Sequence, residues 1–332
     1  MLITRLRRWG RLGIAALAVS AAVALTACSG PAGVKQGDDG GGGEKSDPLK
    51  VAFITHAPPG DTFWDIVRAG AEKAASELNI ELLYSNDEDG ARQAQLVQQA
   101  IDKSVDAIVV TLAKPEAMSG PVKDAVAAGI PVFSLNSGED QYKDMGVLAH
   151  FGQNDRVAGE AAGEKLNELG ATNMICVIQV QGHIGLENRC DGVDETFEGE
   201  FERLYVQGTD MNNVASTITA KLQTGSDIDY VLTLGAPFAM TAIDSIADAG
   251  SDAKLATFDL NAEAIKALQD GDIQFLVDQQ PYLQGYLAVS SARLYHDNGN
   301  VMGGGKPVLT GPQIITQENA ESIAEFAKNG TR

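Results

Sequence analysis

The stretch LKVAFITHAPPGDTFWDIVRAG, Leu49–Gly70, decides the fold because it joins a strand pattern to a helix pattern. Its first seven residues form an apolar run, which predicts a strand buried on both faces of a sheet. The apolar spacing from residue 64 to 78 predicts a helix. Asp61, Phe63 and Trp64 lie at the connection, where aromatic rings would ordinarily be kept away from water. We therefore expect the rings to cover something other than solvent.

The same alternation of strand and helix extends outward along the chain. In the first half we predict strands at 49–55, 80–85, 106–112 and 130–135, with helices at 64–78, 91–104 and 116–128. In the second half we predict helices at 154–169, 188–202, 212–224, 238–249 and 262–270, and strands at 174–180, 229–234, 253–259 and 273–279. The fold class is therefore α/β, with two similar doubly wound, Rossmann-like lobes, each built on a parallel sheet.

The N-terminal end has the composition of an export signal. Residues 1–27 combine a basic start with a short apolar core, which is too short for a comfortable membrane span. The sequence LTACSG around Cys28 resembles the lipobox of bacterial lipoproteins, which implies cleavage before Cys28 and a lipid on its thiol. An ordinary signal with an incidental cysteine is the alternative. Residues 28–48 are rich in Gly, Asp and Lys, which predicts a flexible tether.

Charge and cysteine content exclude some functions. The formal net charge of -20 disfavours nucleic-acid binding, because phosphate backbones are negative. The four histidines have no zinc-ligand spacing, and we expect neither a metal nor a cofactor. In an exported chain, Cys176 and Cys190 are candidates for a disulfide, with two buried thiols as the alternative.

Polar and aromatic residues gather in the segments that follow the predicted strands. Open parallel sheets bind ligands beyond the carboxyl ends of their strands, so these segments are where a ligand site is expected. They read, in chain order, HAPPGDTFW, NSGED, GQND, QGHIGLENRCDG, GAPF, DLNAE and DQQPY.

This ordered set resembles the sugar-binding proteins of bacterial ABC importers, and within them the ribose-type branch of the type I periplasmic binding proteins. The resemblance extends from residue 49 to about 320. It implies two lobes joined by a three-segment hinge, with crossings near 153–154, 279–280 and 305–308. The implied N-terminal lobe is 49–153 plus 280–306, and the C-terminal lobe is 154–279 plus 307–325.

The resemblance also assigns ligand contacts to eight residues, which are Asp61, Phe63, Trp64, Asn136, Asn154, Arg189, Asp259 and Gln279. These types suit a sugar or polyol, because carboxylates, amides and a guanidinium satisfy hydroxyl groups, and rings cover C–H faces. Ser137 stands where the family often has Arg, and Ala236 where it has Asn, which leaves the sugar open. His56 is interpreted as a solvated loop residue.

Each assignment has a simpler alternative. Phe63 and Trp64 could be a hydrophobic staple of their helix, and Asp61 could be its N-cap. Asp259 could cap the helix near 262, and Arg189 could belong to a surface ion pair. Placement of all these residues after successive strands favours a shared ligand site.

The resemblance implies a lipid-anchored solute-binding protein that performs no chemistry. It would bind a monosaccharide or polyol in the cleft between its lobes, close by a hinge, and dock as a monomer on an ABC permease. Its place would be the cell envelope, at the outer face of the cytoplasmic membrane or in the periplasm. Alternatives are a sensory module with the same pocket, and a sugar hydrolase that uses Asp61 and Asp259 as paired carboxylates.

Overall fold

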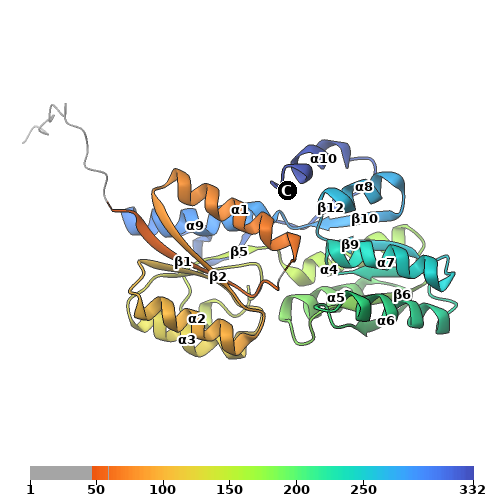
Figure 1. Ribbon diagram of the computed structural model, residues 1–332, viewed down its shortest axis with the longest axis horizontal. Coiled ribbons are helices and arrows are strands. Elements are labelled where there is room, and N and C mark those ends of the chain that lie inside the picture. Colours follow the sequence, from red (N-terminus) through yellow and green to blue (C-terminus); the bar gives the residue numbers. More distant parts are fainter. Residues whose placement is uncertain (1–46, 59) are drawn as a thin grey trace, which may run out of the picture. The chain divides into compact units, whose positions relative to one another are not determined.

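The opening stretch folds as a strand and a helix, as its pattern predicts. The structure is a computed structural model that describes residues 47–58 and 60–332. The strand β1 (Leu49–Thr55) is buried along almost its whole length, and the helix α1 (Thr62–Glu77) follows it. The short connection between them brings its polar and aromatic residues to the carboxyl edge of the sheet (Figure 1).

The strands of residues 47–58 and 60–332 form two six-stranded sheets. Strand pairing is parallel in both sheets, except that the last strand of the second sheet runs antiparallel to its neighbour. In spatial order the first sheet contains β11 (Val308–Leu309), β5 (His150–Gly152), β4 (Val132–Leu135), β3 (Ala107–Thr111), β1 and β2 (Ile80–Asn86). In spatial order the second sheet contains β12 (Gln313–Ile315), β10 (Ile273–Asp278), β9 (Lys254–Phe258), β8 (Tyr230–Thr233), β6 (Asn173–Ile178) and β7 (Glu200–Tyr205).

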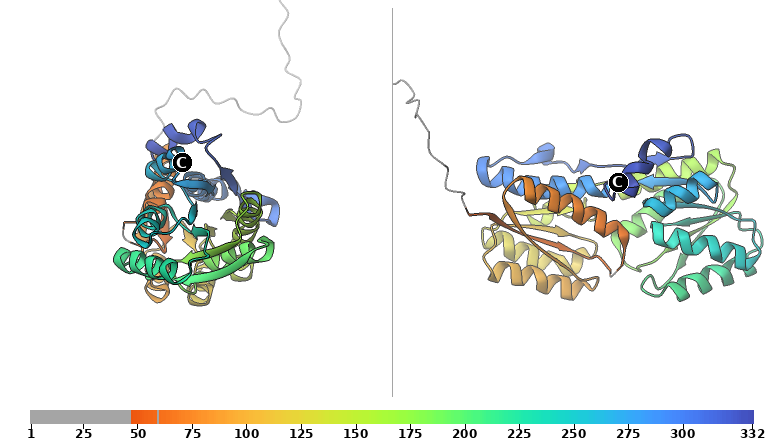
Figure 2. Two further views of the ribbon diagram at one scale, coloured as in Figure 1. Left: turned by 90° about the vertical axis from the view of Figure 1, so that its right-hand side faces the viewer. Right: turned by 45° about the horizontal axis from the view of Figure 1, so that its top comes forward.

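Helices cover both faces of each sheet, as Figure 2 shows. On the first sheet, α1 and α9 (Pro281–Asn298) share one core, while α2 (Gly90–Asp102) and α3 (Pro115–Ala127) share the other. These elements form the first lobe, which also contains the short 3-10 helices at Lys143–Met145 and Met302–Gly305.

The second lobe repeats this arrangement around the second sheet. One face carries α4 (Asp155–Glu168) and α5 (Ile184–Thr196). The opposite face carries α6 (Met211–Thr224), α7 (Ala236–Ala249), α8 (Ala262–Asp270) and α10 (Glu321–Lys328). The central strands occur in the same order in both sheets, so the predicted pair of similar α/β lobes is confirmed.

The chain passes between the sheets three times within residues 47–58 and 60–332. The first two passages, from β5 to α4 and from β10 to α9, lie where they are expected. The third joins β11 to β12 and so lies at 310–312. The predicted crossing at 305–308, and with it the lobe boundary at 306/307, is wrong because β11 pairs with β5 in the first sheet.

One helix prediction is also wrong. The segment predicted as a helix at 188–202 contains α5, which ends at Thr196, and the beginning of the edge strand β7. The strand EFERLY was missed because its exposed and half-buried residues do not form the apolar run of an inner strand.

Two N-terminal predictions fall on segments that are mostly outside this description. The signal peptide and Cys28 lie outside the described residues, as does the tether up to residue 46. Among the helices of residues 47–58 and 60–332, none is both long and apolar enough to cross a membrane.

Candidate ligand-binding site

A cavity lies between the lobes, where the carboxyl ends of the two sheets face each other. Its volume, including the opening to solvent, is about 750 Å³. The residues that line it come from both lobes. Seven of the eight predicted contact residues are among them, namely Asp61, Phe63, Trp64, Asn136, Arg189, Asp259 and Gln279.

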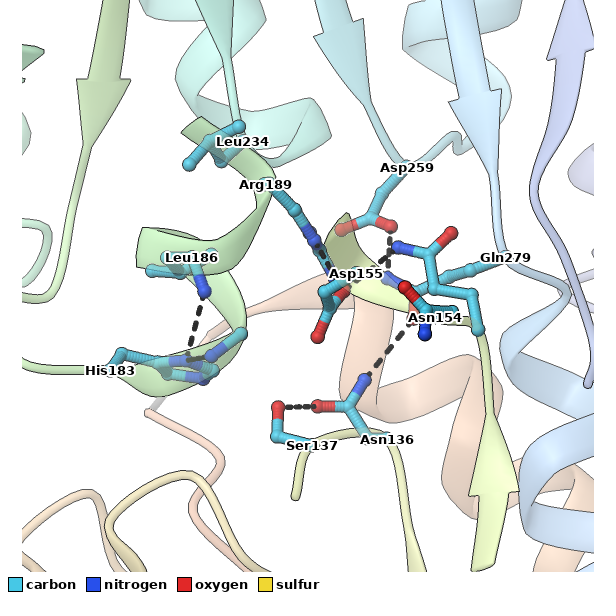
Figure 3. A network of polar contacts seen from close by, with 12 residues as sticks. Asn136, Ser137, Asn154, Asp155, His183, Leu186, Arg189, Leu234, Asp259 and Gln279 are labelled. Carbon is cyan, nitrogen blue, oxygen red and sulfur yellow. Dashed lines mark hydrogen bonds and ion pairs between the residues drawn. The ribbon is translucent and has the colours of Figure 1, made fainter. Parts of the chain in front are cut away.

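Asn154 does not line the cavity, in contrast to its predicted role. Its side-chain oxygen accepts a hydrogen bond from the backbone N–H of Val157 at 2.8 Å and so caps α4. The next residue, Asp155, directs its carboxylate to Arg189, as Figure 3 shows. The predicted crossover is therefore at the right place, but its polar group reaches the cavity only through Arg189.

An aromatic wall is formed by the start of α1. Phe63 and Trp64 are 7% and 6% exposed and meet edge to face, with ring centroids 5.1 Å apart. They belong to the core of the first lobe and also line the cavity, so the staple alternative describes only part of their role. Asp61 likewise makes two contacts. Its carboxylate accepts from the backbone N–H of Phe63 at 3.0 Å, and its side chain also borders the cavity.

Arg189 brings a buried positive charge to the cavity. Its Nε donates to Asp155 Oδ1 at 2.8 Å, and the two side chains are only 4% and 1% exposed. The alternative that Arg189 belongs to a surface ion pair is therefore wrong. Because a buried guanidinium without a partner is costly, Asp155 is what allows Arg189 to lie here.

Close packing of α4 against α5 sets the position of Arg189. A side-chain carbon added at Gly159 would lie 2.1 Å from the backbone oxygen of Arg189. The absence of a Cβ at this position lets the two helices approach closely. The ion pair between Asp155 in α4 and Arg189 in α5 then links them.

A disulfide also fixes α5. Cys176 in β6 and Cys190 in α5 are joined, and both are fully buried. Since Cys190 directly follows Arg189, the bond ties the guanidinium-bearing turn to the second sheet.

Asp259 supplies a buried carboxylate opposite Arg189. Its Oδ1 accepts from Gln279 Nε2 at 2.6 Å (Figure 3), and burial raises its pKa to about 7, against the attraction of Arg189. The alternative role as a helix cap is wrong, because Asn261 caps α8 instead. Asn136 completes this polar chain by donating to Gln279 Oε1 at 3.3 Å.

Asn136 and Asp259 share an unusual backbone conformation. Their φ angles are 67° and 64°, in the left-handed region that residues other than glycine rarely occupy. They follow β4 and β9, which hold equivalent places in the two sheets. The two lobes thus present one polar side chain each to the cavity from a matching, strained position.

The lobes touch each other across the cavity. The backbone N–H of Ile184 in the second lobe donates to the carbonyl of Ala113 in the first at 3.1 Å. Asn261 Nδ2 donates to Thr62 Oγ1 at 3.3 Å. The arrangement described is therefore one in which the lobes are closed on each other.

Other lining residues were missed by sequence reasoning. His56, Lys114, Gln179, His183 and Phe238 border the cavity, and His56 is not merely a solvated loop residue. Three of the five, His56, His183 and Phe238, belong to the segments singled out after the predicted strands, so their location carried a signal, but nothing in their identity did. Within residues 47–58 and 60–332, no group of three or more His, Cys, Asp or Glu residues could hold a metal ion.

The fold and this cavity define a class of protein. Two lobes joined by three chain connections enclose a small site lined by hydrogen-bonding side chains and aromatic rings. Such a site retains a small polar molecule by surrounding it, which is the task of a binding protein with a closing cleft.

Comparison with known proteins agrees with this class. Residues 51–300 match the family model described as a periplasmic binding protein domain, and the chain belongs to that family. The resemblance to the type I periplasmic sugar-binding proteins is thereby confirmed.

Three relatives illustrate the family. A crystal structure of a carbohydrate transporter from Acidothermus cellulolyticus 11B, in complex with myo-inositol, has a TM-score of 0.85 and 49% identity, over 86% of this chain and 100% of that one. The ribose import binding protein of Bacillus subtilis is 26% identical over 81% of this chain and 88% of its own length. The xylose/arabinose-binding protein of Sulfolobus acidocaldarius is 24% identical over 82% of this chain and 72% of its own length.

Proposed function

We propose that this protein is the lipid-anchored substrate-binding component of an ABC importer for an uncharged monosaccharide or polyol, and that a cyclic polyol such as myo-inositol is the preferred ligand. The lipid would be carried by Cys28, which places the protein in the cell envelope. The protein would work without catalysis, by delivering its closed, ligand-bound form to a membrane permease.

One observation carries the proposal. Arg189, Asp259, Asn136 and Gln279 surround a single cavity that Phe63 and Trp64 close on one side. A polyol has hydroxyl groups around its rim and C–H groups on its faces, so it needs both kinds of wall. Each hydroxyl that lost water without gaining a partner would cost about 1–3 kcal/mol.

The charges around the cavity favour a neutral ligand. Arg189 is already paired with Asp155, and Lys114 Nζ donates to the backbone carbonyl of Glu88 at 3.0 Å. Within residues 47–58 and 60–332, neither Asp61 nor Asp259 forms an ion pair with a cationic side chain. An anionic sugar or a sugar phosphate would therefore meet repulsion that a neutral polyol avoids.

The 49% identical relative supports a cyclic polyol, because its structure is described as a complex with myo-inositol. A saturated ring that bears a hydroxyl at every carbon can meet polar groups from both lobes at once. The ribose- and xylose-binding relatives are more distant, and they support only the broader class of sugar ligands.

A binding survey tests the proposal. Thermal unfolding and calorimetric titration of the mature protein would compare myo-inositol, D-ribose, D-xylose, xylitol and D-glucose, with D-glucuronate as the charged control. A ligand at one hundred times its dissociation constant should stabilise the protein by about 2.7 kcal/mol. We expect myo-inositol to do so and D-glucuronate to fail, whereas no response to any neutral compound would refute the proposal.

A further inference from the structure

Two histidines meet across the cavity and connect the lobes directly. His56 follows β1 in the first lobe, and His183 precedes α5 in the second. Their Nε2 atoms are 2.8 Å apart, and the ring centroids are separated by 4.7 Å. At this distance the two nitrogens share one hydrogen bond, so one must donate and the other must accept.

The surroundings of His183 decide which nitrogen donates. Its Nδ1 accepts from the backbone N–H groups of Gly185 at 3.1 Å and Leu186 at 3.3 Å. Nδ1 therefore carries no hydrogen, and the single hydrogen of the neutral ring must be on Nε2. His183 consequently donates to His56, while it also caps α5.

The proton of His56 is fixed in turn. Since its Nε2 accepts from His183, the ring hydrogen is on Nδ1, which lies 2.8 Å from Thr111 Oγ1. Each nitrogen of the pair now has a partner, and both rings are neutral. A second proton on His56 would place two N–H groups against each other at 2.8 Å and break the contact between the lobes.

The neighbouring groups oppose a positive charge on the pair. Burial, followed by the neighbouring His183 and then the charges of Lys114 and Arg189, lowers the pKa of His56 well below its usual value, and burial lowers that of His183 to about 3. Trp64 meets the His56 ring edge to face at 4.8 Å. The other groups on the elements packed around the pair are the neutral Thr111 and Gln93 and six carboxyl groups. These are Asp61, Glu88 and Asp259, which line the cavity, and Asp155, Glu139 and Glu187 near His183.

We propose that His56 and His183 form a proton-sensitive clasp, which positions the lobes for ligand capture while neutral and releases them when His56 takes up a proton. The inference rests on the proposed function, because a clasp matters only if the lobes close around a ligand. Neither histidine belongs to the contact set expected from the sequence.

The geometry sets the direction and size of the effect. When the lobes part, His56 loses its partner and meets water, so its pKa rises toward the ordinary value of a histidine, about 6.5. His183 keeps its two backbone donors, so opening takes up one proton rather than two. Because the closed form has the lower pKa, closure is favoured above about pH 6.5, and ligand affinity should fall about tenfold between pH 7.5 and pH 5.5.

The test compares three proteins with myo-inositol as the probe. Dissociation constants would be measured by calorimetry at about pH 7.5 and about pH 5.5 for the wild type, His56→Gln and His296→Gln. Glutamine can offer an acceptor oxygen to His183 but cannot take up a proton. His296 is an exposed histidine on α9 and serves as the control.

The carboxyl groups of the cavity titrate in all three proteins, so the comparison between them isolates His56. We expect the loss of affinity on acidification to be about tenfold larger in the wild type and His296→Gln than in His56→Gln. Equal losses in the three proteins would overturn the clasp. Thermal unfolding at both pH values checks that each protein stays folded.

A second measurement needs no variant. Nuclear magnetic resonance titration of the His56 ring in the wild type should give a lower pKa with myo-inositol than without it. The same pKa in both states would also overturn the inference.

Failure of the proposed function would be distinguishable. If none of the neutral compounds binds at about pH 7.5, the ligand proposal is refuted, and the clasp is judged on the protein alone. Small-angle scattering should then show a larger radius of gyration at the lower pH in the wild type and no change in His56→Gln. A wild-type radius of gyration that is the same at both pH values would refute the clasp as well.

Discussion

Replacing Asp259 by asparagine should raise the stability of the protein while it weakens ligand binding. Asp259 is 7% exposed, and burial raises its pKa from 3.8 to about 7. The folded protein therefore binds this proton more tightly than the unfolded chain does. Its stability must fall as the pH rises from the unfolded pKa through the folded one.

The size of this effect follows from the shift in pKa. A difference of about 3 units, at 1.36 kcal/mol each, amounts to about 4 kcal/mol once the pH exceeds both values. Asparagine has nearly the same shape and can still accept from Gln279, but it carries no charge. We expect Asp259→Asn to increase the free energy of unfolding by up to about 4 kcal/mol at pH 8 and by about 2 kcal/mol at pH 5.

Urea unfolding at the two pH values measures this difference, and calorimetric titration with myo-inositol measures the loss of binding. Hydrogen bonds to a charged group contribute about 1.5–3 kcal/mol, so affinity should fall between about 10-fold and about 150-fold. Asp278→Asn is a matched control. Asp278 is equally buried but has an ion-pair partner in Arg332 at 2.6 Å, so its replacement should not stabilise.

A variant at position 259 that is no more stable than the wild type, or whose stability gain is the same at both pH values, would refute the reasoning. The first result would mean that burial does not penalise the carboxylate. The second would mean that the gain comes from something other than its charge.

Two further predictions concern the support of Arg189. Gly159→Ala should force α4 and α5 apart, because its Cβ would meet the Arg189 backbone. We expect a lower melting temperature and an affinity for myo-inositol that falls by at least about tenfold. Replacing both Cys176 and Cys190 by serine should cost about 2–4 kcal/mol of unfolding free energy, measured in urea, since the bond closes a loop of 14 residues. Unchanged stability after that replacement would contradict the assigned role of the disulfide.

Much of the fold could be predicted because parallel strands leave a strong pattern. Inner strands such as AIVVT in β3 are fully buried, so every position must be apolar or small. Edge elements lack that constraint. The strand β7 has charged residues on its exposed side and is not predicted, since the helix predicted at 188–202 covers only its first three residues. The strand β11, only two residues long, follows a glycine-rich turn that predicts no strand.

The site was predicted less completely, for a different reason. Asp61, Asn136 and Asp259 each follow a strand, so position and residue type point to the same role. The partnership of His56 and His183 joins residues 127 positions apart, and neither has a neighbour in sequence that reveals the other. Only the folded arrangement brings such residues together, because their contact depends on how two lobes meet.

The left-handed backbone of Asn136 and Asp259 was likewise not evident. Asn and Asp occupy that conformation more readily than other non-glycine residues, but they also occur in ordinary turns. The equivalence of the two positions became clear only when the order of strands in both sheets was known.

The three chain connections between the lobes have a practical consequence for experiment. If the lobes open as proposed, three backbone connections would restrict that opening mainly to rotation about one axis. One well-chosen distance should then report the whole motion. Thr62 and Asn261, which meet at 3.3 Å on opposite rims, are suitable places for a pair of fluorescent labels that would turn the protein into an optical sensor of its own ligand.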